Sequence, residues 1–289
     1  MDTKELLKKV RKIEYKTRKL SQNLFSGEYH STFKGKGMSF SEVRAYQYGD
    51  DVRDIDWNVT ARTGHPYVKL FEEERELTLM LLIDVSGSAF FGTGQGLRRD
   101  LFTEIGATLA FSATQNNDKT GVIFFSDRIE KYIPPKKGRS HILLIIREML
   151  GLQPEGRGTD IGAALEFFHR VVKKRSIAFL MSDFLCEKDY QRPLRVVARK
   201  HDLIGLRLYD PFEQNPPRAG LLRIRQAETG QTGWLDTSSK KNREAFTRHF
   251  TQSRKRFESA FQKASAEQLS LSTEESYVEA LLRFFKQRR

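Results

Sequence analysis

The chain has 289 residues, of which 38% are hydrophobic and 30% charged, and its formal net charge is +13. A chain of this length buries a sizeable core without cross-links, and its single cysteine, Cys186, excludes an intrachain disulfide and fits a reducing compartment. The apolar runs fall far short of the roughly 20 residues that span a bilayer, and the first twenty residues lack the apolar segment of a secretory signal. These features predict a soluble, cytoplasmic protein without transmembrane segments.

The positive charge is concentrated at the two ends of the chain. Residues 1–20 hold eight Lys or Arg against three Asp or Glu, and residues 240–289 hold twelve against six. Basic ends attract nucleic acid, anionic lipid or an acidic partner. Most charge runs are instead solvent-facing helix surfaces, so we favour a solvated helix face and keep nucleic-acid binding as an alternative.

The chain begins with a predicted basic helix, which we assign to residues 1–26. Apolar residues recur there at helical spacing between lysines and arginines, from Leu6 to Leu20. Residues 27–76 are rich in glycine, aromatics and charge but have little periodicity. This second segment is therefore predicted to form short strands and loops.

A regular alternation of strands and helices is predicted for residues 77–210. Continuous apolar runs indicate strands buried on both faces: LTLMLLID, TGVIFFS, SIAFLMSD and DLIGLRL. Amphipathic segments between them indicate helices, and KYIPP indicates an edge strand because its prolines cannot donate to a ladder. This pattern predicts an α/β fold, a mostly parallel sheet with helices on both faces.

Residues 211–289 form the last predicted part, a hairpin followed by C-terminal helices. The stretch LLRIRQAETGQTGWLDT alternates around a Thr-Gly turn, which is typical of a hairpin. Beyond it, phenylalanines recur at helical spacing from Phe246 to Phe261, and a second apolar face starts at Tyr277. We expect these aromatic side chains to belong to the core.

Polar side chains follow the predicted strands where they end, at the edge where open parallel sheets bind ligands. Asp84 ends the first strand and is followed by Ser86 and Ser88; Thr159 precedes a helix; Asp183 ends the third strand. Carboxylates and hydroxyls without imidazole or thiolate suit Mg²⁺, Mn²⁺ or Ca²⁺ and disfavour structural zinc. Each residue also has an ordinary interpretation, because such side chains commonly cap helices and order loops.

The three segments DVSGS, GTD and SDF together resemble the metal-ion-dependent adhesion site of the von Willebrand factor A domain. The resemblance implies that Asp84, Ser86 and Ser88 are first-loop metal ligands. It further implies that Thr159 is the second-loop ligand and Asp183 the third-loop aspartate. In that family the open position of the metal commonly accepts a carboxylate from a partner protein, so a metal-dependent protein partner is expected.

The chain is also similar to the domain-of-unknown-function 58 family. GKGMSFSEVRAYQYGDDVRDIDWNVTARTGHPYVKLFEEERE resembles the family signature, and PPKKGR, MSDF, RKHD and YDPFE extend the match from about Gly27 to Thr237. The resemblance implies a Rossmann-like domain of the von Willebrand factor A kind, often encoded beside a MoxR-type AAA+ ATPase. Such an ATPase is therefore the expected partner. Some relatives carry membrane-spanning segments, which this sequence lacks.

Four aspartates of the signature lie close together beside several arginines: Asp50, Asp51, Asp54 and Asp56. A calcium loop would need EF-hand spacing and a distal glutamate, which are absent, and a catalytic acid pair is the other alternative. The guanidinium groups of these arginines can form bidentate ion pairs with the aspartate carboxylates. We favour an ion-pair network that pins residues 27–76 to the main domain, with Trp57 as an anchor.

No catalytic constellation stands out, so an enzyme is not predicted. The leading hypothesis is a metal-dependent protein–protein interaction module that works with a MoxR-type ATPase in chaperone-like remodelling or complex assembly. The second is nucleic-acid binding through the basic ends. The third is a metal-dependent hydrolase. It needs a general base near the open position, which would be Asp160 or one of the aspartates from Asp50 to Asp56.

Overall fold

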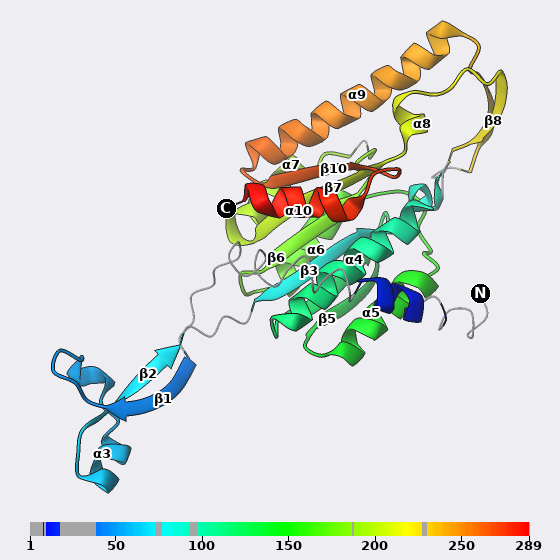
Figure 1. The fold of residues 1–289 in the computed structure, drawn as a ribbon. Coiled ribbons are helices and arrows are strands. Elements are labelled where there is room, and N and C mark those ends of the chain that lie inside the picture. The colour runs from blue at the N-terminus through cyan, green and yellow to red at the C-terminus, as the bar shows by residue number, and fades with distance from the viewer. Residues whose placement is uncertain are drawn as a thin grey trace. The chain divides into compact units, whose positions relative to one another are not determined.

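The computed structural model describes residues 8, 10–17, 39–72, 77–92, 97–186, 188–226 and 230–288. The chain forms two compact units: a smaller one of residues 33–77, and a larger one of residues 1–32 and 78–289. The ribbon in Figure 1 shows the elements of each. The packing of residues 27–76 on the main domain stays a prediction. The predicted domain boundaries also stay predictions.

The smaller unit is built on one antiparallel pair of strands, with two short helical segments between them in the chain. Its elements are β1 (Ser39–Ala45), η1 (Val52–Asp54), α3 (Trp57–Thr63) and β2 (Tyr67–Glu72). Gly64 ends α3 in the left-handed conformation, with φ of 74°, which glycine adopts without strain. The predicted short strands and loops are thus confirmed, whereas the helical segments η1 and α3 differ from the prediction.

The larger unit is built around a six-stranded sheet. In spatial order its strands are β5 (Ile129–Lys136), β4 (Lys119–Phe125), β3 (Thr78–Asp84), β6 (Ile177–Ser182), β7 (Asp202–Tyr209) and β10 (Glu267–Ser272). Neighbours pair in parallel, except that β4 and β5 are antiparallel. Counted along the chain, this is the doubly wound order 3-2-1-4-5-6, whose switch point lies between β3 and β6.

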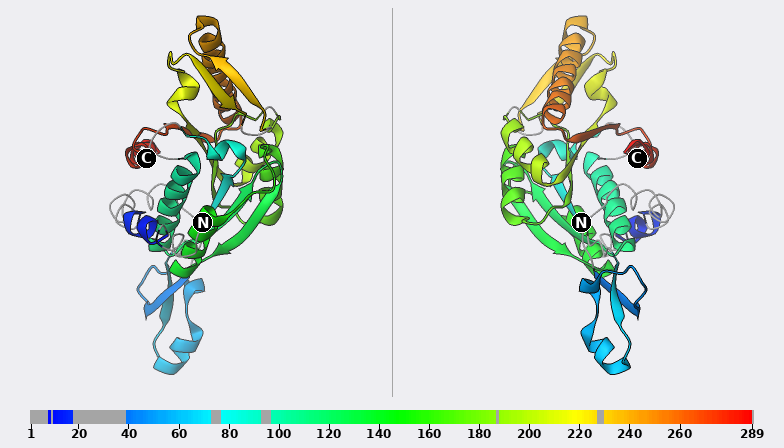
Figure 2. Two further views of the ribbon diagram at one scale, coloured as in Figure 1. Left: turned by 90° about the vertical axis from the view of Figure 1, so that its right-hand side faces the viewer. Right: turned by 90° about the vertical axis from the view of Figure 1, so that its left-hand side faces the viewer.

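Helices cover both faces of this sheet (Figures 1 and 2). One face is covered by α6 (Ile161–Val171), α7 (Gln191–Lys200) and α9 (Lys240–Lys263), and the other by α4 (Arg98–Gln115), α5 (Arg139–Gly151) and α10 (Tyr277–Gln287). Leu82 and Leu180 pack with the first group. Phe179, which points to the opposite side of β6, contacts Phe285 of α10. The predicted α/β sheet with helices on both faces is confirmed.

The other described elements of the larger unit are short: η2 (Gly87–Phe90), α8 (Pro211–Gln214), β8 (Leu221–Arg225) and β9 (Thr232–Asp236). β8 and β9 pair antiparallel, which confirms the predicted hairpin. β5 lies at the edge of the main sheet, as predicted from its two prolines. Among the described residues, no helix combines the length and the apolar character needed to cross a membrane.

The N-terminal basic helix uses part of its charge within the larger unit. Residues 10–17 are helical, and Val10 packs in one cluster with side chains of α4 and α5. Lys16 pairs with Glu104 of α4, and Glu14 pairs with Arg139 of α5. Lys16 is therefore neutralised by α4, while Glu14 of the same helix neutralises a cation of α5.

β10 differs from the expectation that the end of the chain is helical. Residues 267–272 form the sixth strand and pair in parallel with β7. The strand reads EQLSLS, with only two apolar side chains, and so lacks the continuous apolar run of a central parallel strand. Its first four residues are only partly buried, so it needs no such run.

α9 lies so close to the sheet that β7 needs glycine at position 205. A Cβ at Gly205 would overlap the ring of Phe261 and lie 3.0 Å from a ring carbon of Phe257. We expect Gly205→Ala to lower the free energy of unfolding by about 1–3 kcal/mol, the usual cost of overpacking. Urea denaturation measures the change.

The matched control is Gly233→Ala in β9, where the added carbon meets nothing within 4 Å. Its free energy of unfolding should change by no more than about 0.5 kcal/mol. Equal stabilities of the two variants would contradict the close packing of α9 on β7.

Candidate metal site

The candidate site begins with two buried aspartates at one edge of the main sheet. β3 ends at Asp84, and its parallel neighbour β6 ends at Ser182, directly before Asp183. Asp84 is 2% exposed and Asp183 is 3% exposed. This edge is the switch point of the sheet, where neighbouring connections leave in opposite directions and open a crevice.

Asp84 is held in place by neutral donors. Its Oδ1 accepts the backbone N–H of Ser86 at 2.9 Å, and its Oδ2 accepts the hydroxyl of Ser182 at 2.6 Å. Burial, and then the negative charge of Asp183, raise the pKa of Asp84 to about 7 in spite of these bonds. The two carboxylates therefore lie close enough to repel each other.

Ser86 and Ser88 lie on the loop that follows Asp84. Their hydroxyl oxygens are 3.1 Å apart, and Ser86 is fully buried. The N–H of Gly87 between them donates to the carbonyl of Arg157 at 3.0 Å. This bond brings the loop that contains Thr159, itself 6% exposed, to the same edge of the sheet.

Asp160, next to Thr159, is committed to structural bonds. It begins α6 by accepting the N–H of Ala163 at 2.9 Å, and it pairs with Lys188 at 2.7 Å. Burial alone would raise the pKa of Asp160, but these hydrogen bonds and the lysine charge lower it below its ordinary value. A carboxylate in this environment is a weak general base, which disfavours the hydrolase hypothesis.

Arg98 is the main site residue that the sequence does not reveal. Its guanidinium, 1% exposed, donates through Nη1 to Asp183 Oδ2 at 2.6 Å and to the carbonyl of Ser88 at 3.2 Å. Through Nη2 it pairs with both carboxylate oxygens of Glu213 at 2.7 and 2.8 Å. Arg98 thus links the aspartate of β6, the loop after β3 and helix α8.

Arg207 of β7 brings a second buried cation to the site. Its Nε donates to the carbonyl of Asp183 at 3.2 Å, and its guanidinium lies 4.6 Å from the ring centre of Phe250. Together, three carboxylates (Asp84, Asp183, Glu213) and two guanidinium groups leave one formal negative charge. With every group ionised, the site is therefore short of positive charge by one unit, which a bound cation or a proton on Asp84 can supply.

The five predicted ligands fit a hard divalent cation by their chemistry. They offer carboxylate and hydroxyl oxygens only, which suit Mg²⁺, Mn²⁺ or Ca²⁺. Within the described part of the chain, no group of three or more His, Cys, Asp or Glu is arranged to hold a metal. A metal at this edge would therefore depend on the serine and threonine hydroxyls, and the ligand set stays a prediction.

Three of the four aspartates of the smaller unit have local partners. Asp50 forms a bidentate pair with Arg44, at 2.7 and 2.9 Å, and this hydrogen-bonded pairing lowers the pKa of Asp50. Asp51 and Asp56 accept backbone N–H groups at the starts of η1 and α3. Trp57 is 67% exposed. An ion-pair network to the main domain stays a prediction.

Arg98→Met leaves the buried Asp183 and the half-buried Glu213 without their shared cation. We expect it to lower the free energy of unfolding by about 3–5 kcal/mol, because an uncompensated buried charge is costly. Arg195→Met removes the same charge from an exposed position of α7 and should change stability by no more than about 0.5 kcal/mol. Urea denaturation at neutral pH compares the two; equal losses would contradict the role of Arg98.

The chain belongs to the family described as "Protein of unknown function DUF58", which matches residues 42–256. It is 29% identical over 291 residues to "Uncharacterized protein Mb1516" of Mycobacterium bovis, an alignment that covers 100% of this chain and 92% of the relative. The predicted membership of this family is thus confirmed.

Two solved structures are similar to parts of this chain. BatB from Bacteroides thetaiotaomicron, described as a conserved hypothetical protein, is similar over 73% of this chain and 98% of its own, with a TM-score of 0.50 and 15% identity. The VWA domain of SpRpn10 is similar over 72% and 94%, with a TM-score of 0.37 and 11% identity. The chain thus shares with BatB the α/β fold of a mostly parallel sheet with helices on both faces. The von Willebrand factor A character of this fold is what the sequence resemblance implies.

Proposed function

We propose that this protein is an interaction module that holds a divalent cation at the carboxyl ends of β3 and β6 and presents it to a carboxylate of a partner protein. The observation that carries this proposal is the pair of buried aspartates, Asp84 and Asp183, at the switch point of the sheet. Buried carboxylates in such proximity are costly unless a cation compensates them. Arg98 compensates the charge of Asp183. The charge of Asp84 is then left for a metal ion to compensate.

In this proposal the metal ligands are those predicted from the sequence: Asp84, Ser86, Ser88, Thr159 and Asp183. Mg²⁺ is the first choice, with Mn²⁺ or Ca²⁺ as alternatives, and the bound ion supplies electrostatic attraction for an external oxygen. Asp183 already accepts Arg98 on Oδ2 and the N–H of Leu185 on Oδ1. Each carboxylate oxygen has a further lone pair, so Asp183 can also serve a metal or a metal-bound water.

The charge of the site supports a carboxylate as the group that is recognised. Without metal, the buried charged groups sum to one negative charge; a divalent cation changes this to one positive charge. An incoming carboxylate then restores neutrality. Ser182 maintains the geometry, because its hydroxyl holds one oxygen of Asp84 while the other faces the loop of Ser86.

Titration calorimetry tests the metal. Wild type should bind Mg²⁺ or Mn²⁺, and Asp84→Asn should bind at least about tenfold more weakly, because it removes a charged ligand at constant size. Asp160→Asn is the matched control, since Asp160 adjoins Thr159 but is committed to α6 and Lys188. Equal binding by wild type and Asp84→Asn would contradict the site, provided that urea denaturation shows both to be folded.

A MoxR-type AAA+ ATPase, or a client that it remodels, is the partner that we propose, on the basis of the family resemblance. Affinity capture from cells with tagged wild type should retain this partner with Mg²⁺ and lose it in EDTA. Tagged Asp84→Asn should retain little of it under either condition. If the same proteins are retained in EDTA, or equally by Asp84→Asn, recognition through the metal is contradicted.

A further inference from the structure

Helix α9 carries far more positive charge than its packing uses. Its 24 residues include eight Lys or Arg and two Glu. Its buried side chains start at Phe250, so the first ten residues of the helix bury none. This half of α9 is joined instead to α8 and to the β8–β9 hairpin, and its cations face solvent.

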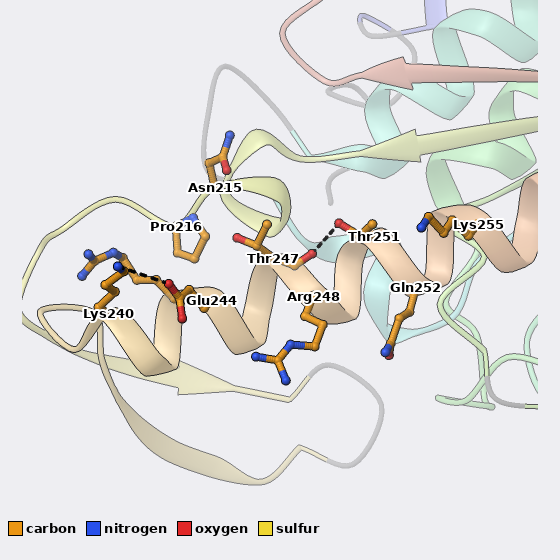
Figure 3. Close-up of a pocket in the computed structure, with 10 residues that line it drawn as sticks. Asn215, Pro216, Lys240, Glu244, Thr247, Arg248, Thr251, Gln252 and Lys255 are labelled. Atoms are coloured by element: carbon orange, nitrogen blue, oxygen red, sulfur yellow. Dashed lines mark hydrogen bonds and ion pairs between the residues drawn. The ribbon is translucent and has the colours of Figure 1, made fainter.

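A groove of about 720 Å³ follows this part of the helix. Figure 3 shows its lining side chains along α9 from Lys240 to Lys255, with Asn215 and Pro216 beside the helix. The row of cations from Lys240 through Arg248 to Lys255 is about 22 Å long at 1.5 Å per helical residue. The hydroxyls of Thr247 and Thr251 already donate to the carbonyls of Gln214 and Thr247, at 3.0 and 2.7 Å. The amide side chains of the lining, Asn215 and Gln252, are the neutral hydrogen-bond donors.

The cations of this groove are little neutralised. Lys240 has a distant ion pair with Glu244 at 3.7 Å. Arg243 donates to the carbonyls of Thr237 and Ser238, at 2.6 and 2.9 Å, and so keeps its charge. Arg248 and Lys255 make no ion pair with any described residue. An anionic ligand therefore meets a row of available positive charge.

The hairpin beside the groove carries an exposed aromatic ring among arginines. Trp234 of β9 is 68% exposed and lies directly opposite Arg223 of β8. Arg225 lies two residues further along the same face of β8. At the hairpin turn, the position of a Cβ on Gly230 lies 3.5 Å from guanidinium nitrogens of both Arg225 and Arg157, so two cations converge there.

The hairpin is attached to the helix that lines the groove. β9 ends at Asp236, and α9 begins four residues later at Lys240. Asn242 donates to the carbonyl of Asp236 at 3.0 Å, and Arg243 binds the two residues after it. These bonds attach the end of β9, the strand that contains Trp234, to the start of the cationic row.

We propose that the hairpin and the groove together bind single-stranded nucleic acid, with bases stacked on Trp234 and phosphates paired with the hairpin arginines and the cations of α9. A cationic groove beside a solvent-exposed aromatic ring is the combination by which proteins bind single strands without sequence preference. An acidic peptide would use the cations but leaves the tryptophan ring unexplained. This binding does not depend on the metal site and persists in EDTA.

Fluorescence anisotropy with labelled poly(U) and poly(dT) of about 12 nucleotides tests the groove. The triple variant Lys240→Ala, Arg248→Ala, Lys255→Ala should bind at least about tenfold more weakly at low salt. The slope of log K against log salt should fall by about 2, since each lost phosphate contact on a single strand contributes about 0.7. All measurements are made in EDTA, so a failed metal site leaves the result intact.

The matched control removes three exposed arginines from α7, on another part of the same unit: Arg192→Ala, Arg195→Ala, Arg199→Ala. It has the same net charge as the groove variant and should bind like wild type, within about threefold. Equal losses in the two triple variants show non-specific attraction to total charge and overturn the proposal. Absence of binding by wild type at about 50 mM salt overturns it as well.

Tryptophan fluorescence tests the platform. The chain has two tryptophans, so Trp57→Phe leaves Trp234 as the single reporter. Poly(U) should quench it, and Trp234→Ala should weaken binding by about 5- to 150-fold, the range measured for base stacking on aromatic side chains. Polyglutamate that binds as tightly as poly(U), with Trp234 unquenched, identifies an acidic protein surface as the ligand and overturns nucleic-acid binding.

Discussion

The edge of the sheet in the larger unit depends on how the charges of two buried carboxylates, Asp84 and Asp183, are compensated. Parallel pairing of β3 with β6 brings Asp84 and Asp183 to one edge of the sheet, beneath the loops that cover it. Ser182, backbone N–H groups and Arg98 bind their oxygens. Because Arg98 also binds Glu213, helix α8 is tied to the same edge. Compensation of one buried charge thus organises the loops around the candidate site.

The central strands and the position of Asp84 could be predicted because their signals are local. Apolar runs such as that of β3 indicate strands buried on both faces, and the residue after such a run lies at the ligand-binding edge. Arg98 could not be predicted, because its partners Asp183 and Glu213 lie 85 and 115 residues away in the chain. β10 is not predictable for a related reason: it is only partly buried, so its position beside β7 requires no apolar pattern of its own.

The two basic ends of the chain differ in whether their cations form ion pairs. Lys16 of the N-terminal helix is paired with an acidic residue of α4, which agrees with the interpretation of a basic helix face as structural. On α9, Arg248 and Lys255 have no such partner among the described residues. The acidic edge of the sheet and the basic surface of α9 and its hairpin therefore suit ligands of opposite charge, and chelation of metal separates their functions experimentally.

The most direct test of the account is a crystal structure grown with Mn²⁺ and measured near the manganese absorption edge. The account predicts an anomalous peak within the roughly 2.0–2.6 Å bonding range of hard cations from an oxygen of Asp84, with hydroxyls of the adjoining loops also in range. A structure in which manganese binds elsewhere, or in which Asp84 and Asp183 bind no ion at saturating manganese, would contradict it.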